Sequence, residues 1–227
     1  MSLFITTLNN QEKMRDCYDV LDLGKTISID LSSEDAIWNN FTSKNRNTIR
    51  SAQKNNIEIK HCFDKKTFNE FKNIYEITMN KDNADSYYYF KDDFYDSILN
   101  DLYDNGDIFF AEYEDKPIAA TIILKCNDKL TYHFSGVITE YRNLQGTSLM
   151  LYEVAKWGCQ NGYKTFHLGG GVGSKEDNLY KYKAAFNRKG ELQYSLGRRI
   201  FNKNKYDYLV SLRDGELRDN FFPLYRA

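Results

Sequence analysis

Hydrophobic residues in the first third of the chain follow two periods, and each period predicts a different element. Residues from Thr26 to Leu31 alternate and are rich in β-branched side chains, which is typical of a strand. Residues 33–55 follow a helical period, and residues 57–63 alternate again. The spacing from Thr67 to Glu70 is that of a capping box with Thr67 as the N-cap, so a further helix is expected to begin there.

The pattern in the middle of the chain predicts three strands joined by short turns. They are expected at residues 107–113, 118–125 and 130–137, after a helix over residues 92–103. Strands spaced so closely form an antiparallel meander. The remaining expected elements are a helix over 146–161 with Gly162 as its C-cap, a strand over 163–168, a short helix over 177–186, a strand over 192–201 and a terminal helix over 205–213.

This order of elements predicts the fold class. A meander followed by a crossover helix and another strand gives a mixed sheet with helices on both faces, so we expect an α/β protein of the α+β mixed-sheet kind. From Ile57 onward the order resembles that of GNAT acyltransferases, which implies a GNAT-like acyl-CoA N-acyltransferase fold. Residues 1–32 are interpreted as an N-terminal segment that is a remnant of a preceding domain, 33–215 as the GNAT-like domain and 216–227 as a C-terminal tail.

Composition narrows the class of function. The formal net charge of the 227 residues is −1, which argues against a DNA-binding protein. The four cysteines are scattered without metal-ligand spacing, so we expect reduced thiols in a cytoplasmic protein, with no metal. No apolar stretch approaches the ~20 residues of a membrane-spanning helix, so membrane contact is expected only through a lipid-linked substrate.

A glycine-containing turn leads into the helix expected at 146–161. Gln145, Gly146, Thr147 and Ser148 are expected to place unpaired backbone N–H groups and the positive end of the helix dipole together. Such a site suits the pyrophosphate of coenzyme A. GNAT enzymes typically carry Gln/Arg-x-x-Gly-x-Gly/Ala at this turn, and here the middle glycine is kept while both ends depart. A phosphate site and a plain tight turn both remain open.

A second glycine-rich loop follows the strand expected at 163–168. Gly169, Gly170 and Gly171 remove side chains where a substrate or another backbone comes close. The loop lies at the end of a strand, where open α/β sheets tend to bind ligands. Its spacing fits neither a Walker loop nor GxGxxG, so a donor-binding loop and a flexible turn are both compatible with it.

Two motifs resemble the Fem family, whose members transfer amino acids from aminoacyl-tRNA to the peptide of a cell-wall precursor. One motif is Phe166-His-Leu-Gly-Gly-Gly followed by Leu179-Tyr-Lys-Tyr-Lys-Ala-Ala-Phe186. The other is Trp38 with the basic segment from Lys44 to Lys54. The first motif also resembles GNAT-like acyltransferases encoded with surface-polysaccharide genes. The resemblance covers most of the chain.

The resemblance implies a catalytic role for Lys183, which matches the lysine of the family's Phe/Tyr-Lys-x-x-Phe pattern. A fixed ammonium at this position is expected to stabilise the oxyanion of acyl transfer, or to hold a phosphate of the donor. Without the resemblance, Lys183 is a solvated helix lysine like Lys181. Phe186 is expected to pack beneath the site. Fem proteins usually have two GNAT-like domains, whereas these 227 residues have room for one. The resemblance therefore does not imply that the chain depends on tRNA.

Two groups of side chains are candidates for substrate binding. Arg46 and Arg50 share one stripe of a helix without acids nearby, which either binds an anionic partner or is a solvated face paired with acids elsewhere. Tyr88 and Tyr89 lie between two helices, where they either line an acceptor groove or pack the loop.

Tyr132 and His133 lie on the last strand of the meander, which flanks the donor in GNAT folds. Tyr132 is a candidate contact of the substrate. His133 is a candidate base that deprotonates the attacking amine, and His167 is a similar candidate. For both histidines the alternative is a structural role.

Together these features favour an N-acyltransferase of the GNAT/Fem type. The acceptor amine is expected to belong to a cell-envelope precursor, an amino sugar or a peptide, and to attack the donor directly. The donor is expected to be acyl-CoA, such as acetyl-CoA, or aminoacyl-tRNA, in which case tRNA is a partner. The alternative is a non-catalytic binding domain, a shortened Fem-like remnant that holds an anionic precursor.

Overall fold

The computed structural model describes residues 2–6, 15–213 and 221–226, and their strands form one mixed sheet. The strand order is β1-β8-β2-β7-β6-β5-β4-β3. Among the described pairs, β6 and β7 run parallel and the others run antiparallel. The strands are β1 (Ser2–Thr6), β2 (Asp19–Asp30), β3 (Glu58–Cys62), β4 (Gly106–Tyr113), β5 (Lys116–Cys126), β6 (Lys129–Val137), β7 (Thr165–Gly169) and β8 (Glu191–Arg198).

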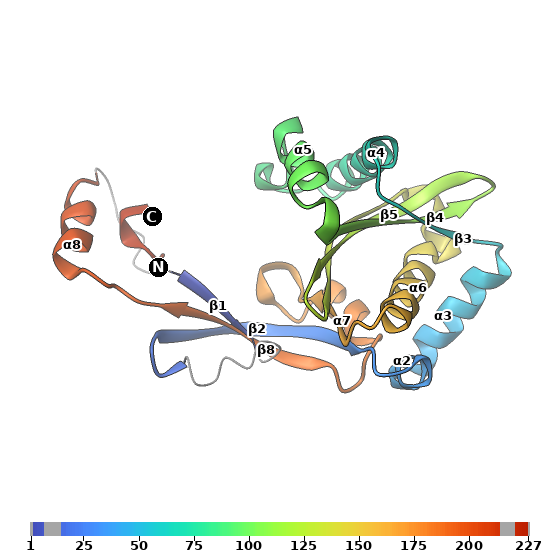
Figure 1. The fold of residues 1–227 in the computed structure, drawn as a ribbon, viewed down its shortest axis with the longest axis horizontal. Helices are drawn as coiled ribbons and strands as arrows, with labels where there is room; N and C mark the ends of the chain where they lie inside the picture. Colours follow the sequence, from blue (N-terminus) through green and yellow to red (C-terminus); the bar gives the residue numbers. More distant parts are fainter. Residues whose placement is uncertain (1, 7–14, 214–220, 227) are drawn as a thin grey trace.

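Helices cover both faces of the sheet, as the sequence predicts (Figure 1). On one face α4 and α5 pack against β4, β5 and β6, and on the opposite face lie α2, α3, α6 and α7. The predicted meander is confirmed as β4, β5 and β6. The helices are α2 (Glu34–Asn40), α3 (Ser43–Lys54), α4 (Lys65–Lys81), α5 (Asp92–Asp101), α6 (Gly146–Gln160), α7 (Asn178–Ala184) and α8 (Lys203–Ser211).

Each face has its own hydrophobic core. Under α4 half of the buried core residues are aromatic, and one of them, Phe71, is fully buried. Under α6 the core combines Met150 and Val154 of the helix with Phe166 of β7, all of them fully buried. Burying one such side chain stabilises the fold by about 1.5–3 kcal/mol. The two cores hold the middle strands of the sheet in place from both sides.

The single helix predicted over residues 33–55 is wrong, because the chain forms two helices there. Phe41 ends α2 in an extended conformation with ψ 149°, and its side chain is fully buried. Thr42 then caps α3, and its hydroxyl accepts a 3.2 Å hydrogen bond from the backbone N–H of Asn45. The helical period continues across this break, so the hydrophobic pattern alone does not reveal it.

The predicted capping box before α4 is wrong in register. Asp64, not Thr67, is the N-cap, and its carboxylate accepts a 2.9 Å bond from the Thr67 N–H. The Thr67 hydroxyl in turn accepts a 3.1 Å bond from the Asp64 N–H. The reciprocal pair therefore lies three residues earlier than predicted, with threonine at the third helical position.

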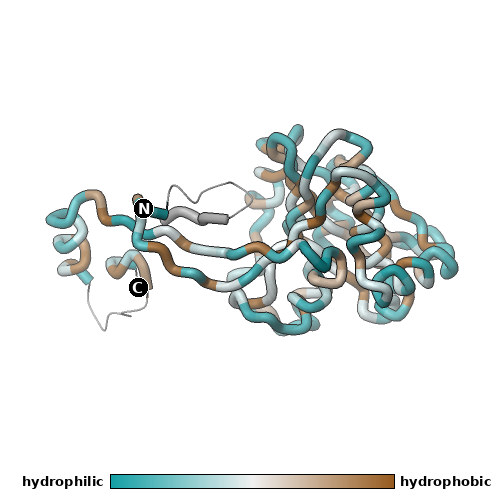
Figure 2. The backbone as a smooth tube through the Cα atoms, turned by 90° about the horizontal axis from the view of Figure 1, so that it is seen from below, coloured by the Kyte–Doolittle hydropathy of each residue, from teal (hydrophilic) through white to brown (hydrophobic). Residues whose placement is uncertain are grey.

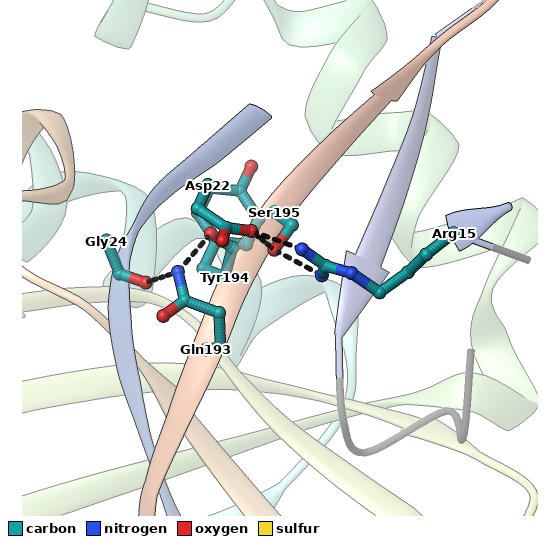
Figure 3. A network of polar contacts seen from close by, with 6 residues as sticks. All are labelled: Arg15, Asp22, Gly24, Gln193, Tyr194 and Ser195. Carbon is teal, nitrogen blue, oxygen red and sulfur yellow. Dashed lines mark hydrogen bonds and ion pairs between the residues drawn. The ribbon is translucent and has the colours of Figure 1, made fainter. Parts of the chain in front are cut away.

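The strand predicted at 26–31 is longer than expected, because β2 begins at Asp19. With β1 and β8 it forms a ribbon that leaves the body of the molecule and ends near α8 (Figures 1 and 2). On this ribbon the carboxylate of Asp22 accepts bonds from Ser195, at 2.5 Å, and Arg15, at 2.8 Å (Figure 3). Because β2 lies between β8 and β7, residues 19–30 share the sheet of the body, and the division of the chain at residues 32 and 215 stays a prediction.

Across the described residues, no helix has both the length and the apolar content that crossing a bilayer requires.

Candidate functional site

The central parallel pair of strands separates halfway along β6. Pairing with β7 runs from Lys129 to Thr131 and stops there, although β6 continues to Val137. A bulge accompanies the separation, because Ile122 of β5 lies opposite Phe134 and the next β5 residue lies opposite Tyr132. At the far end of β6, the N–H of Val137 donates a 2.8 Å bond to the hydroxyl of Thr78 on α4. The sheet thus has a gap in its pairing beyond Thr131.

Lys183 lies at this gap. It is 8% exposed, and its ammonium donates a 2.7 Å bond to the carbonyl oxygen of Gly170. The same nitrogen lies 5.8 Å from the centre of the Tyr132 ring. Within the described part of the chain it forms no ion pair. Burial lowers the pKa of Lys183 to about 8, although the Asp177 carboxylate opposes part of this shift.

Two tyrosines, Tyr132 and Tyr182, belong to the same part of the structure as Lys183. Tyr182 lies next to Lys183 on α7, and the hydroxyl of Ser148, in the first turn of α6, is 3.4 Å from its phenolic oxygen. Burial raises the pKa of Tyr132 to about 12 and also raises the pKa of Tyr182. Both phenols are therefore protonated at neutral pH and are able to donate hydrogen bonds. The sequence indicated Tyr132 and Ser148 separately as site residues and did not indicate Tyr182.

The glycine loop is shaped by close backbone contacts. A Cβ at Gly170 would lie 2.6 Å from the carbonyl oxygen of Lys25 on β2. A Cβ at Gly171 would lie 2.1 Å from the carbonyl oxygen of Lys175. Gly169 has a φ of +75°, and a Cβ added to it would lie 3.4 Å from the Lys183 nitrogen. These glycines let the loop press onto β2 and bring a carbonyl to Lys183.

Two charged residues that the sequence did not indicate fix this loop. Asp177 caps α7 with a 2.9 Å bond from the Tyr180 N–H and also accepts a 3.1 Å bond from the Val172 N–H. Lys25 pairs with Glu176 at 3.3 Å and with Glu191 at 3.0 Å. Backbone hydrogen bonds to Asp177 hold the pKa of its carboxyl below the ordinary value, so the cap is charged at neutral pH. The contacts of Asp177 are to backbone N–H groups, and those of Lys25 are to residues far away in the sequence, so the spacing of residues along the sequence does not reveal them.

The turn before α6 is tight for a packing reason as well. Gly146 is buried, and a Cβ on it would lie 3.1 Å from the Ala111 side chain and 3.2 Å from Ile118. Gln145 takes a left-handed conformation, and its carbonyl accepts bonds from the N–H groups of Ser148 and Leu149. The N–H groups of Gly146 and Thr147 have no backbone partner among the described residues. The segment is therefore a tight turn that also presents two backbone N–H groups without a backbone partner.

The two candidate bases differ in their surroundings. His133 is the bulged residue of β6, is exposed and lies against the Phe134 ring at 3.9 Å. Partial enclosure lowers its pKa. His167 lies on β7 beside the gap, where burial and the charge of Lys183 lower its pKa to about 4. Both imidazoles are neutral at pH 7.

Arg46 and Arg50 lie on α3 and have partners there. Arg46 donates a 2.6 Å bond to the carbonyl oxygen of Phe41 and a 3.1 Å bond to Ser43, so it closes the break between α2 and α3. Arg50 is exposed and lies 5.1 Å from the Trp38 ring. Among the described contacts, none joins either arginine to Lys183.

The other predicted substrate contacts lie apart from the gap. Tyr88 and Tyr89 lie in the loop after α4, and the hydroxyl of Tyr89 donates a 2.9 Å bond to Asn80. Phe186 is fully buried and packs 5.4 Å from the Tyr182 ring, so it supports the site from behind and does not itself reach a substrate. The structure thus groups Lys183, Tyr132, Ser148 and the glycine loop, and leaves the arginines and the tyrosine pair elsewhere.

The chain resembles known proteins in sequence family and in fold. Residues 43–184, more than half of the chain, match the acetyltransferase (GNAT) domain family. Among curated proteins no relative matches the sequence.

Solved structures share the fold at low identity. FemX has a TM-score of 0.66 at 14% identity, over 91% of this chain and 74% of that chain. L-PGS from Bacillus licheniformis has a TM-score of 0.57 at 15% identity, over 89% and 69%. A conserved protein of unknown function from Bacteroides thetaiotaomicron has a TM-score of 0.62 at 12% identity, over 87% and 69%. The GNAT-like fold predicted from the order of elements is confirmed, and the chain belongs to the acetyltransferase (GNAT) domain family.

Proposed function

We propose that the chain is an N-acyltransferase that moves an acyl or aminoacyl group directly onto an amine of a cell-envelope precursor, an amino sugar or a peptide. Transfer takes place at the gap between β6 and β7, next to Lys183. Membership of the GNAT family supports acyl transfer. The Fem-like motifs around Gly169 and Lys183 support the envelope acceptor.

The observation that carries the proposal is the buried, unpaired ammonium of Lys183. A buried charge is costly unless it is paired, and Lys183 has one carbonyl contact and no ion pair within the described residues. With a pKa of about 8, the side chain is mostly protonated at neutral pH. An oxyanion that forms beside Lys183 is stabilised by this ammonium, which has no anionic partner among the described residues of the unliganded protein.

The reaction proceeds through one tetrahedral adduct. The neutral acceptor amine attacks the carbonyl carbon of the donor, so the C–N bond forms and the carbonyl π electrons move onto oxygen. Lys183 stabilises this oxyanion, with the Tyr132 and Tyr182 hydroxyls as further donors nearby. The adduct then collapses, the thiolate of coenzyme A leaves, and the amine loses a proton. His133 and His167 are both neutral bases on β6 and β7 for that proton.

The donor is proposed to be acyl-CoA, with aminoacyl-tRNA as the alternative. The unpaired N–H groups of Gly146 and Thr147 open a helix of 15 residues, and Ser148 in the same turn lies beside Tyr182. A pyrophosphate bound at this end of α6 leads its thioester toward Lys183. With aminoacyl-tRNA the leaving group is a ribose hydroxyl, and the same carbonyl chemistry applies.

Thermal stabilisation of the protein by acetyl-CoA, coenzyme A and a UDP-linked muramyl peptide tests the proposal. A ligand at 100 times its Kd stabilises the fold by ~2.7 kcal/mol, which is a visible shift. A shift with coenzyme A supports an acetyltransferase, and a shift with the muramyl nucleotide alone supports aminoacyl transfer. If none of the three ligands shifts the unfolding temperature and no donor supports turnover, the chain is a non-catalytic domain and the proposal fails.

A further inference from the structure

One face of the central strands carries a polar strip, formed by hydroxyl groups and one imidazole. The registers define it, because Ser28 of β2 lies opposite His167 of β7, and Thr131 of β6 lies beside His167. Residues that alternate with them point to the other face, into the core under α6. The polar strip consists of Thr26 and Ser28 on β2, Thr165 and His167 on β7, and Thr131 on β6.

Three atoms of the polar strip are buried without a hydrogen-bond partner. They are the hydroxyl oxygens of Thr26 and Thr165 and the Nε2 of His167. They make up half of the buried unpartnered side-chain atoms found among the described residues. Thr26 is 5% exposed, and a buried hydroxyl without a partner costs about 1–3 kcal/mol. Because they group on two neighbouring strands, one ligand bound there would supply all the missing hydrogen bonds.

The polar strip reaches the gap at Lys183. Strands β6 and β7 separate directly after Thr131 and His167. The Thr26 methyl group lies 3.7 Å from the Cβ position of Gly170, whose carbonyl accepts the Lys183 bond. Tyr180 of α7 and the buried residues of α6 lie on the opposite face of the sheet, in the core under α6. The gap therefore lies between two different surroundings. On one face are α6 and α7, where the acyl donor is proposed to bind, and on the other face is the polar strip.

The chemistry of the polar strip selects uncharged ligands. Its hydroxyls and neutral imidazole both donate and accept hydrogen bonds, as the hydroxyls of a sugar require. The five residues include no charged side chain, so the polar strip itself gives an anionic group no charged partner. Two charged residues, Asp30 and Lys129, flank Thr165 at the end of the strip away from Lys183.

We propose that the polar strip binds the acceptor and that the acceptor is an amino sugar whose ring carries no anionic group, held through its hydroxyls by Thr26, Thr165 and His167. Its amine then lies at the gap, on the side opposite the donor. This inference rests on the proposed function, since it takes the gap at Lys183 as the place of transfer. Thr165 and His167 are half-buried, and a rotation of the threonine side chains about χ1 exchanges the positions of methyl and hydroxyl group.

Binding of amino-sugar methyl glycosides, followed by NMR titration without any donor, tests the inference. The panel carries the amine at position 2, 3 or 4. Thr26→Val removes one hydroxyl at constant shape, so affinity is expected to fall about 3- to 10-fold, the equivalent of one hydrogen bond. The unfolding temperature is expected to stay equal or rise, because an unpartnered hydroxyl is removed. Thr165→Val provides a second variant with the same expectation.

Thr48→Val is the matched control. Its hydroxyl has a partner, the carbonyl oxygen of Lys44 at 3.1 Å on α3, so sugar affinity is expected to be unchanged. The inference is overturned if no member of the panel binds, if both strip variants bind as tightly as the unchanged protein, or if a glycyl peptide amine binds and the sugars do not.

An acetyl-CoA titration on the same samples separates this inference from the proposed function. Donor binding and acetylation of a peptide amine, without sugar binding, removes the polar strip as the acceptor site and leaves the acyltransferase intact. Sugar binding that depends on Thr26, without donor binding or turnover, keeps the strip as a sugar site and removes the acyltransferase.

Discussion

The ammonium of Lys183 bonds to the carbonyl oxygen of Gly170 at 2.7 Å, so a residue on α7 is held by the loop that ends β7. The loop in turn presses on β2, where the backbone of Lys25 occupies the space that a side chain at Gly170 would need. This chain of contacts fixes a buried positive charge at the point where β6 and β7 separate.

Lys183→Met is expected to stabilise the unliganded protein. It replaces a buried charge with an apolar chain of similar length, which should raise the free energy of unfolding by about 1–3 kcal/mol at pH 7. The folded pKa of about 8 is lower than the ordinary value of 10.5, so the penalty is complete below pH ~8 and is relieved as the pH rises toward ~10.5. Urea unfolding at pH 7 and pH 10 should show the advantage of the variant shrinking. Lys181→Met, on the exposed side of the same helix, is the control and should change little.

Turnover is expected to fall as the pH rises through about 8. The oxyanion is stabilised by the protonated form of Lys183, whose pKa burial lowers to about 8. With an acceptor amine that is already neutral at pH 7, kcat should decrease about tenfold per pH unit above this value. Lys183→Arg stays charged throughout, so its lower rate should remain flat at high pH. An equal decline in both proteins would assign the titration to another group.

Gly170→Ala is expected to disrupt the site. The new methyl carbon would lie 2.6 Å from the carbonyl oxygen of Lys25, so the loop must move and stability should fall by about 1–3 kcal/mol. Gly173→Asn is the control, because nothing lies within 4 Å of its Cβ position and asparagine tolerates its φ of +59°. Thermal unfolding and turnover of both variants check this. Normal stability of Gly170→Ala would show that the loop is not packed as described.

Arg46→Met and Arg50→Met are expected to differ. Arg46 bonds the carbonyl oxygen of Phe41 between α2 and α3, so its loss should lower the free energy of unfolding by about 1–3 kcal/mol. Arg50 is exposed, lies over the Trp38 ring and donates one exposed 3.2 Å bond to Asn47, so its loss should cost about 0.5–1 kcal/mol. If the basic stripe binds an anionic precursor, Arg50→Met instead weakens that binding and reduces its salt dependence. Chemical unfolding and a salt series of binding measurements distinguish the two roles.

Local pattern predicts much of this fold. The three strands predicted in residues 107–137 are confirmed as β4, β5 and β6, whose side chains point in turn into the two cores while the turns between them carry polar residues. The break at Thr42 was missed, since its helical period is continuous and a buried Phe41 causes the turn. The start of β2 was missed because its first residues, in the ribbon, are mostly exposed and lack an alternating pattern.

The candidate site also contains some residues that the sequence indicated and others that only the fold brings together. Lys183 and the glycine loop lie within one motif, and the motif resemblance is what indicated them. Ser148 meets Tyr182, and Thr26 shares a face with His167, only through the folded sheet. Asp177 and Lys25 act by tertiary contacts that depend on the close approach of loop and strand. Partners this far apart in sequence become visible only when the register of the strands is known.

Single-turnover acyl transfer by Lys183→Met tests the central claim most directly. Unchanged protein, Lys183→Met and Lys181→Met are mixed with saturating acetyl-CoA and an amine acceptor, and donor affinity is measured in parallel. Loss of the oxyanion partner should reduce the transfer rate of Lys183→Met by at least about 100-fold, while its donor Kd stays within about tenfold and Lys181→Met behaves normally. Transfer by Lys183→Met within a few fold of the unchanged protein would contradict the assignment of Lys183 as the group that stabilises the oxyanion.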